Sequence, residues 1–333
     1  MRIVFVTQAA DPSHPVLGAT LPKIRALAER ADEVVVLADS VDESALPDGV
    51  RARSFAAPTQ TARGMRYLAA LAPELTRRPV AVVAHMAPIF AVLAAPVAKP
   101  LRVPLLLWFT QQAAGPALQA AERVVDRLLT VDERSVPLRS RKLRAIGHGI
   151  DVAALPCVPE RRPPLRRLLG LGRYAPVKGW ETVLEALPAL PDATLAVHGP
   201  MLTDADRAHR PYLEARAREL GVADRVTFGE AVPYAAVPHL FGLADAVVDA
   251  TRGNAADKVV YEAAAACLPV FAASPVFDTL LPEELRFHGD YPDSLADRIR
   301  RYDGGAGRGL RSRVEAGHSV DHWAERVLEE AGA

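Results

Sequence analysis

Short apolar runs alternate with longer amphipathic segments along nearly the whole chain. Six runs in the first half occupy residues 2–8, 33–39, 80–86, 104–110, 127–133 and 143–149. Five more follow at residues 165–172, 193–199, 225–229, 246–250 and 269–274. Apolar runs that alternate with segments of helical length are typical of parallel sheets wrapped by helices. The pattern therefore predicts an α/β fold.

A proline-rich and basic stretch divides the chain into two halves. Four prolines within residues 151–167 disfavour regular structure there. The pattern predicts one domain over residues 1–150 and another over 151–315, and 333 residues are enough for two domains. Residues 316–333 have apolar side chains at helical spacing, and we expect them to form a helix that packs back on the first domain.

One apolar segment has the length of a membrane span. Residues 79–98 contain no formally charged side chain. Three prolines and His85 within the segment favour a buried strand, a turn at Pro88 and a core-facing helix instead. The first residues also lack the pattern of a secretion signal, so we expect a cytoplasmic protein.

The amino-acid composition indicates which kinds of molecule the protein is expected to bind. The 40 basic residues equal the 40 acidic residues in number, so no long-range field favours nucleic acid. The basic runs 139–144 and 161–167 favour weak contact with an acidic or membrane surface, although a solvated linker face is the simpler interpretation. Cys157 and Cys267 are far apart in sequence and fit a reducing compartment. No ligand set predicts a metal, and no cofactor is expected.

The stretch LGLGRYAPVKGWETVLEAL, residues 169–187, places Arg173 and Lys178 in a glycine-bearing turn between a predicted strand and a helix that begins near Trp180. Only five of the 40 basic residues are lysines. A lysine kept in such a chain hints at a compact ammonium that meets a phosphate. We interpret the turn as a clamp for a diphosphate, and ordinary surface cations are the alternative.

The same turn contains a second pattern. Gly170, Gly172 and Ala175 satisfy G-x-G-x-x-A after a strand, which is the pattern of dinucleotide-binding turns. That arrangement needs the helix to begin within the glycine turn. Pro176 and Gly179 interrupt the segment, so a nicotinamide dehydrogenase ranks last among the functions considered.

A second candidate site lies in TRGNAADKVVYEAAAACLP, residues 251–269. Asn254 belongs to a polar loop after a predicted strand, and Asp257 is expected to cap the helix that follows. Lys258 and Glu262 are four residues apart and share one face near the helix amino end. Phosphate suits that end of a helix, and a carboxylate one turn further suits ribose hydroxyls. A simple helical ion pair is the alternative.

Together the two stretches form a more specific pattern. Residues 165–274 resemble the carboxyl-terminal domain of family-four retaining glycosyltransferases through GRYAPVKGWETVLEAL, TLAVHGP, DRVTFGEAVPYAAVPHLFGLADAVVDA and DKVVYEAAAACLPVFAAS. The resemblance implies the GT-B architecture, in which two Rossmann-like domains face each other. It also implies transfer of a sugar from a nucleoside-diphosphate donor, with a UDP-sugar favoured, to a hydroxyl acceptor with retention of configuration.

The resemblance also implies roles for individual residues. Arg173 and Lys178 hold the diphosphate beside Gly172 and stabilise the charge that grows there as the glycosidic bond breaks. The departing phosphate takes the proton of the acceptor, so no carboxylate base is expected. The other donor contacts implied in this half are Val232 at the base, Lys258 at the helix start and Glu262 at the ribose.

Asn254 departs from the family pattern, which is Glu, seven residues, Glu. An amide can donate and accept hydrogen bonds to a sugar hydroxyl, so Asn254 stays a donor-binding candidate. Loss of the carboxylate also admits a scaffold of the same fold that binds nucleotide without turnover. A sugar-nucleotide epimerase is a further alternative, and it would need acid and base carboxylates near the sugar.

Four candidates lie in the first half. Gly18, in TQAADPSHPVLGAT, matches the glycine of a family loop near the donor phosphate and the acceptor. Gln111 stands close to the place where relatives often carry a histidine beside the transferred sugar. His85 is the nearest alternative imidazole or a core residue. Asp132 follows a predicted strand and is a candidate for contact with the acceptor hydroxyl.

Overall fold

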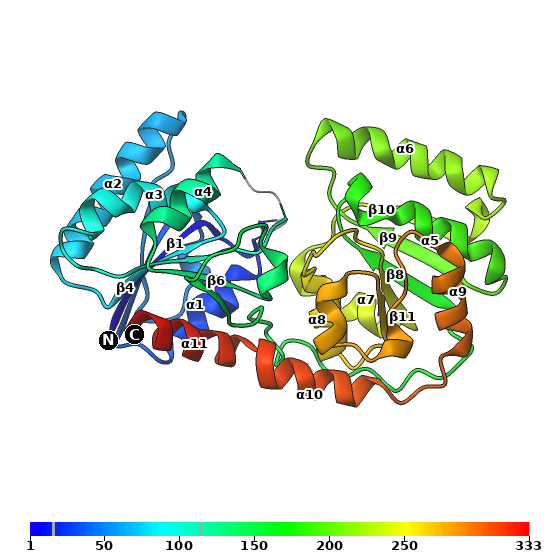
Figure 1. Cartoon of the computed structure of the whole chain (residues 1–333). Helices are drawn as coiled ribbons and strands as arrows, with labels where there is room; N and C mark the ends of the chain where they lie inside the picture. Colours follow the sequence, from blue (N-terminus) through cyan, green and yellow to red (C-terminus); the bar gives the residue numbers. More distant parts are fainter. Residues whose placement is uncertain (15–16, 113–114, 333) are drawn as a thin grey trace. The chain divides into compact units, whose positions relative to one another are not determined.

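The computed structural model describes residues 1–14, 17–112 and 115–332 and divides into two compact units (Figure 1). The first unit comprises Met1–Gly149 and Gly317–Ala333, and the second comprises Ile150–Ala316. Each unit contains a parallel sheet with helices on both faces, so the predicted fold class is confirmed.

Seven parallel strands form the sheet of the first unit, in the order β3-β2-β1-β4-β5-β6-β7. Six of them match the predicted apolar runs, whereas β3 reads RARS and was not predicted. An edge strand with no partner on one side needs no apolar pattern. The strands are β1 (Arg2–Ala10), β2 (Glu33–Val41), β3 (Arg51–Ser54), β4 (Ala81–His85), β5 (Leu105–Trp108), β6 (Arg127–Thr130) and β7 (Leu143–Ala145).

Helices cover both faces of this sheet (Figure 1). The buried side chains of α2 (Gln60–Thr76), α3 (Pro88–Ala98) and α4 (Pro116–Val124) form one core with the strands. On the other face, α1 (Thr20–Ala28) lies against α11 (Val320–Gly332). Trp323 of α11 packs edge to face on Phe5, with ring centroids 6.4 Å apart. The last helix therefore belongs to the core of the first unit.

The apolar segment 79–98 forms β4 and α3, as its prolines predicted. α3 is 11 residues long and packs against α2, α4 and β5. Among the helices that the structure describes, none combines the length and the apolar character needed to cross a bilayer.

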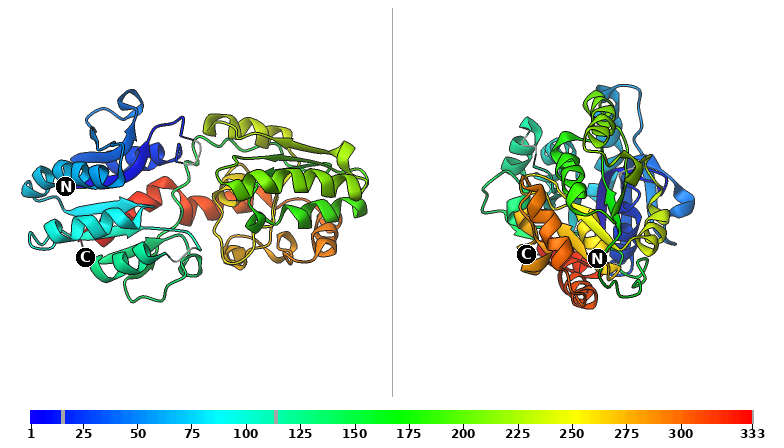
Figure 2. Two further views of the ribbon diagram at one scale, coloured as in Figure 1. Left: turned by 90° about the horizontal axis from the view of Figure 1, so that it is seen from above. Right: turned by 90° about the vertical axis from the view of Figure 1, so that its right-hand side faces the viewer.

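Five parallel strands form the sheet of the second unit, in the order β10-β9-β8-β11-β12, and each matches a predicted apolar run. Figure 2 shows them with helices on both faces. The strands are β8 (Arg167–Leu171), β9 (Thr194–His198), β10 (Val226–Gly229), β11 (Ala246–Asp249) and β12 (Val270–Ala272). The helices are α5 (Trp180–Ala186), α6 (Asp204–Glu219), α7 (Val237–Leu243), α8 (Lys258–Ala265), α9 (Pro292–Arg301) and α10 (Gly307–His318).

Residues 151–166 of the proline-rich stretch contain no regular helix or strand, as predicted, but the interpretation of the two cysteines as reduced was wrong. Cys157 of this stretch forms a disulfide with Cys267, and their Cα atoms are 5.0 Å apart. The stretch passes the carboxyl end of α8, where the Val158 N–H donates to the Ala266 carbonyl at 2.9 Å. Because the two cysteines are paired, they no longer support a reducing compartment.

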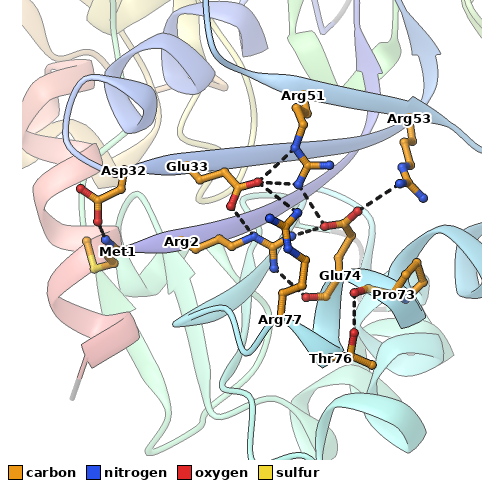
Figure 3. A network of polar contacts seen from close by, with 10 residues as sticks. All are labelled: Met1, Arg2, Asp32, Glu33, Arg51, Arg53, Pro73, Glu74, Thr76 and Arg77. Atoms are coloured by element: carbon orange, nitrogen blue, oxygen red, sulfur yellow. Dashed lines mark hydrogen bonds and ion pairs between the residues drawn. The ribbon is translucent and has the colours of Figure 1, made fainter.

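An ion-pair network closes the amino-terminal edge of the first sheet (Figure 3). Glu74 of α2 is only 2% exposed and pairs with Arg2 at the start of β1 and, at 3.3 Å, with Arg51 at the start of β3. Arg2 also pairs with Glu33 at the start of β2, at 2.8 Å. A hydrogen bond from Arg51, partly opposed by burial and supported by Arg2, lowers the pKa of Glu33. The network joins three strands and a helix.

Replacing Glu74 by glutamine is expected to destabilise the first unit strongly. The amide keeps the shape of the side chain but leaves the surrounding guanidinium groups without their buried counter-charge. We expect the free energy of unfolding, measured in urea, to fall by about 3 kcal/mol. The control is Asp297→Asn in α9, whose pair with Arg300 is exposed and is expected to matter by less than about 1 kcal/mol. Equal losses of stability in the two variants would contradict the assignment of Glu74 as the buried counter-charge of the network.

Candidate functional site

Two loops of the second unit meet where the strand order of its sheet reverses. From the centre of the sheet, β8 leads to β9 on one side, whereas β11 leads to β12 on the other. In open α/β sheets, ligands bind at such a switch point, outside the carboxyl ends of the strands. The turn after β8 carries Arg173 and Lys178, and the loop after β11 carries Asn254 and leads into α8 with Lys258 and Glu262.

Packing explains the glycine pattern of the first turn. A Cβ atom added to Gly170 would lie 2.5 Å from the ring of Trp180, whose indole N–H donates to the Arg173 carbonyl at 2.9 Å. A Cβ atom at Gly172 would touch the Lys178 side chain at 3.4 Å. The chain then forms a single 3-10 turn, Pro176–Lys178, before α5 begins at Trp180. The helix does not start within the glycines, so the dinucleotide arrangement is not formed.

Close backbone contacts tie this turn to the neighbouring strands. Gly179 has a φ of +63°, and a Cβ atom there would lie 2.3 Å from the Ala250 carbonyl oxygen just after β11. The Arg252 N–H donates to the Val177 carbonyl at 2.9 Å. The Tyr174 hydroxyl donates to the carbonyl of the last residue of β10 at 2.7 Å. The cationic turn is therefore held against both β10 and β11.

Both predicted clamp cations have carboxylate partners within the second unit. The Nη1 atom of Arg173, a residue 38% exposed, lies 3.4 Å from Oδ2 of Asp206 in the first turn of α6. Lys178 is only 16% exposed and pairs with Asp257. Burial lowers the pKa of Lys178, but the charges of Asp257 and Asp249 outweigh it, so the pKa is raised. Arg173, in the same turn after β8, opposes this rise by repulsion of the ammonium.

The side chain of Asp257 does not cap α8, so this expectation was wrong. Asp257 occupies the N-cap position, but its carboxylate turns to Lys178 and accepts a hydrogen bond from the Thr251 hydroxyl at 2.5 Å. The carboxylate is therefore bound by the Lys178 ammonium and not by the helix amides. The first turn of α8 is left without a cap from this residue, and uncapped amides at a helix amino end suit an anion.

Asp249 lies behind this pair at the end of β11. It is 3% exposed, and its carboxylate accepts the Thr251 N–H at 3.0 Å. Burial, together with the neighbouring charge of Asp257, raises the pKa of Asp249 to about 7. The pKa of Asp257 is lowered, because Lys178 and hydrogen bonds outweigh its burial. No local pattern along the chain predicts this acidic pair.

Lys258 and Glu262 form the ion pair that their spacing allows, and a third residue joins them. The Lys258 ammonium lies 3.9 Å from the ring centroid of Tyr234, two residues after Val232. Burial lowers the pKa of Lys258 against the opposing effect of Glu262. The pKa of Tyr234 is raised, chiefly by burial and then by the neighbouring charge of Glu262. Tyr234 was missed, although it lies in the segment assigned to the base.

The four candidates of the first unit follow the carboxyl ends of its strands. Gly18 belongs to the loop after β1 and packs closely, since a Cβ atom there would lie 2.7 Å from a carbonyl oxygen of the same loop. Residues 15–16 of that loop lie outside the described residues. Gln111 follows β5 and is exposed, and Asp132 follows β6 and pairs with Arg134 at 2.8 Å. These candidates therefore share one edge of the first sheet.

His85, the fourth candidate, occupies a core position at the end of β4. Its ring is 3% exposed and stacks on Trp108, with centroids 4.9 Å apart. Its Nδ1 atom lies 3.4 Å from the Thr7 hydroxyl. Burial, with a smaller effect of Lys23, holds the pKa of His85 well below its ordinary value. The imidazole is therefore neutral, and its surroundings match the core alternative.

Two Rossmann-like units with a switch-point site define the GT-B class of fold. The chain is similar over 99% of its length to sucrose-phosphate synthase from Thermosynechococcus elongatus, with a TM-score of 0.74, 17% identity and 98% of that chain covered. Anabaena HepE in complex with UDP-glucose gives a TM-score of 0.75 at 17% identity, with 99% of this chain and 98% of that chain covered. Because the sequence identity to these two structures is so low, the similarity shows a shared fold and not a shared function.

The second unit is similar in sequence to a known family of domains. Residues 160–301 match the family model described as Glycosyl transferases group 1, and this match covers most of the second unit. Part of the chain is similar to curated proteins, and the shared segment spans less than half of each relative's length. Within the described ranges, no group of three or more His, Cys, Asp or Glu residues is arranged to hold a metal ion.

Two curated relatives show the extent of the similarity. One is the GDP-mannose-dependent alpha-(1-6)-phosphatidylinositol monomannoside mannosyltransferase of Mycolicibacterium smegmatis, which is 33% identical over 40% of this chain and 38% of its own length. The other is the D-inositol 3-phosphate glycosyltransferase of Mycobacterium marinum, which is 27% identical over 50% of this chain and 30% of its own length.

The contact between Gly179 and Ala250 can be tested with a matched pair of glycines. Gly179 and Gly221 both have positive φ, +63° and +69°, but a Cβ atom at Gly221 would meet no atom within 4 Å. We expect Gly221→Ala to cost about 1–2 kcal/mol of stability, from the left-handed backbone alone. Gly179→Ala adds a clash with a carbonyl oxygen and should cost clearly more in the same thermal unfolding experiment. Equal costs would show that the contact is not tight.

Proposed function

We propose that the protein transfers a sugar from a nucleoside-diphosphate sugar, with a UDP-sugar favoured, to a hydroxyl acceptor with retention of configuration. The observation that carries the proposal is the position of Lys178 beside the amino end of α8, whose first turn Asp257 leaves uncapped. Arg173 lies in the same turn after β8 as Lys178. The group 1 domain and a fold neighbour solved with UDP-glucose support this proposal. A relative named as GDP-mannose-dependent makes guanosine the second base to test.

The chemistry follows from the charge that the bond cleavage creates. As the bond between sugar and phosphate breaks, negative charge grows on the diphosphate. Two preorganised cations and the positive end of a helix dipole lower the energy of that charge. The departing phosphate oxygen is placed to accept the proton of the acceptor hydroxyl, so the reaction needs no separate carboxylate base.

The remaining donor contacts follow along the same unit. Glu262 is 7% exposed and takes the ribose hydroxyls in this proposal, exchanging part of its contact with Lys258. The backbone around Val232 flanks the base, and the ring of Tyr234 lines the same part of the site beside Lys258. Asn254, just before α8, contacts a hydroxyl of the transferred sugar through its amide.

Removing the ammonium of Lys178 is expected to abolish most turnover. Lys178→Ala should lower the rate of sugar transfer by about 100-fold, which corresponds to about 3 kcal/mol of lost transition-state stabilisation. The rate is measured as UDP or GDP release from UDP-glucose and GDP-mannose. Arg207→Ala serves as the control, because this arginine is 55% exposed and pairs with the exposed carboxylate of Asp204. A variant that keeps the wild-type rate would reject the clamp.

A scaffold that binds nucleotide without turnover is the second candidate, because Asn254 replaces the first family glutamate. Donor hydrolysis without acceptor separates the two functions. We expect the protein to release nucleoside diphosphate slowly from its donor, and to do so faster than the Lys178→Ala variant. A protein that binds the donor but releases no more than this variant is a scaffold. An epimerised sugar nucleotide among the products would instead indicate an epimerase.

The acceptor is best sought among phosphorylated polyols. The names of both curated relatives contain an inositol phosphate unit, either free or within a lipid. We therefore propose inositol phosphates and phosphoinositide glycolipids as the first acceptors to offer. Weak contact with a membrane surface through the basic runs 139–144 and 161–167 would accompany a lipid acceptor.

A further inference from the structure

The ammonium of Lys178 already has an anionic partner in the structure. Lys178 and Asp257 are 16% and 19% exposed, and their ion pair is shielded from most solvent. The Thr251 hydroxyl donates to the same oxygen of Asp257 at 2.5 Å. The carboxylate is therefore fixed by two donors at the amino end of α8.

This carboxylate stands where the proposed function places a diphosphate. Both groups need the same ammonium, and a carboxylate beside a bound phosphate is repelled by it. Aspartate is a favoured N-cap residue, yet Asp257 does not cap α8. Its side chain is thus committed to Lys178 and not to the helix.

We propose that Asp257 is an internal competitor of the donor diphosphate. In the empty site Asp257 neutralises Lys178, and when a diphosphate binds, the ammonium passes from Asp257 to the phosphate. Asp257 and the adjacent Asp249 then take up a proton from solvent between them. This inference rests on the proposed function, because it requires a diphosphate at the switch point.

The surrounding charges fix the sign of the pH effect. Lys178 faces Asp257 from the turn after β8, Asp249 faces it from β11, and the Thr251 hydroxyl donates to it. Arg173 acts on this group only through its repulsion of Lys178. Losing Lys178 and gaining an anionic neighbour both raise the pKa of the acidic pair. Because binding then takes up a proton, affinity must fall as the pH rises. The terminal phosphate of UDP or GDP loses its last proton near pH 6, so between pH 7 and 9 the diphosphate of these two ligands does not change charge. Pyrophosphate releases a further proton in this range and is therefore used only to compare variants at one pH.

Calorimetric titrations with UDP, GDP and inorganic pyrophosphate test the competition. We expect wild-type affinity to fall between pH 7 and pH 9. At pH 9, Asp257→Asn should bind the nucleotides about tenfold more tightly than wild type, because the variant removes a negative charge beside the diphosphate, and a tenfold change corresponds to a shift of one pKa unit. The variant should also lose most of the pH dependence of binding. Asp245→Asn is the matched control, since Asp245 immediately precedes the same strand β11 at its other end and pairs with Arg167. It should bind like wild type.

Proton uptake provides a readout that a merely structural role would not move. The proton that wild type takes up on binding at pH 8 comes from the buffer, and HEPES and Tris have different ionisation enthalpies. The binding enthalpies measured in the two buffers should therefore differ in proportion to the fraction of a proton taken up. Asp257→Asn should show little difference between the buffers. Because the wild-type measurement needs no variant, it tests the inference even if Asp257→Asn does not fold.

Each outcome decides between the claims. If UDP or GDP binds but Asp257→Asn binds it no more tightly, or if wild type takes up no proton, the competition is wrong and the donor site stands. If neither nucleotide binds but the variant gains affinity for pyrophosphate, the nucleotide donor is wrong and the competition stands. If no probe binds wild type or variant, both claims are rejected.

Discussion

The ammonium of Lys178 is held away from bulk solvent, and a cation in that position needs a compensating negative charge nearby. Asp257 and Asp249 supply it, although they lie about 70 to 80 residues further along the chain. This requirement brings the turn after β8 and the start of α8 together at the centre of the sheet. The tight contact between Gly179 and Ala250 fixes the same two loops through the backbone. The site thus depends on charge compensation within a rigid frame.

The fold separates this site from the elements that stabilise the protein elsewhere. In the first unit, the Arg2–Glu74 network lies at the amino ends of the strands, whereas the candidates Gly18, Gln111 and Asp132 follow the carboxyl ends. In the second unit, the disulfide lies at the carboxyl end of α8, and Lys258 and Glu262 lie at its start and one turn further on. Changes at the stabilising edges can therefore be told apart from changes at the site.

Local patterns predicted most of the fold and part of the site. Eleven strands follow from apolar runs because buried parallel strands are apolar on both faces, whereas the polar edge strand β3 has no such signal. The position of α8 followed from its helix-forming sequence. The Asp249–Asp257 pair, Tyr234 and the disulfide were missed, because each depends on contacts between segments far apart in sequence. The prediction that Asp257 caps α8 failed because Lys178, which is far away in sequence but adjacent in the fold, binds the carboxylate.

A crystal structure of the protein with UDP or GDP tests the central claim most directly. The account predicts both phosphates at the switch point of the second unit, with phosphate oxygens about 3 Å from the Lys178 ammonium and the Arg173 guanidinium and facing the first amides of α8. A nucleotide bound elsewhere, with Lys178 still paired to Asp257, would contradict it.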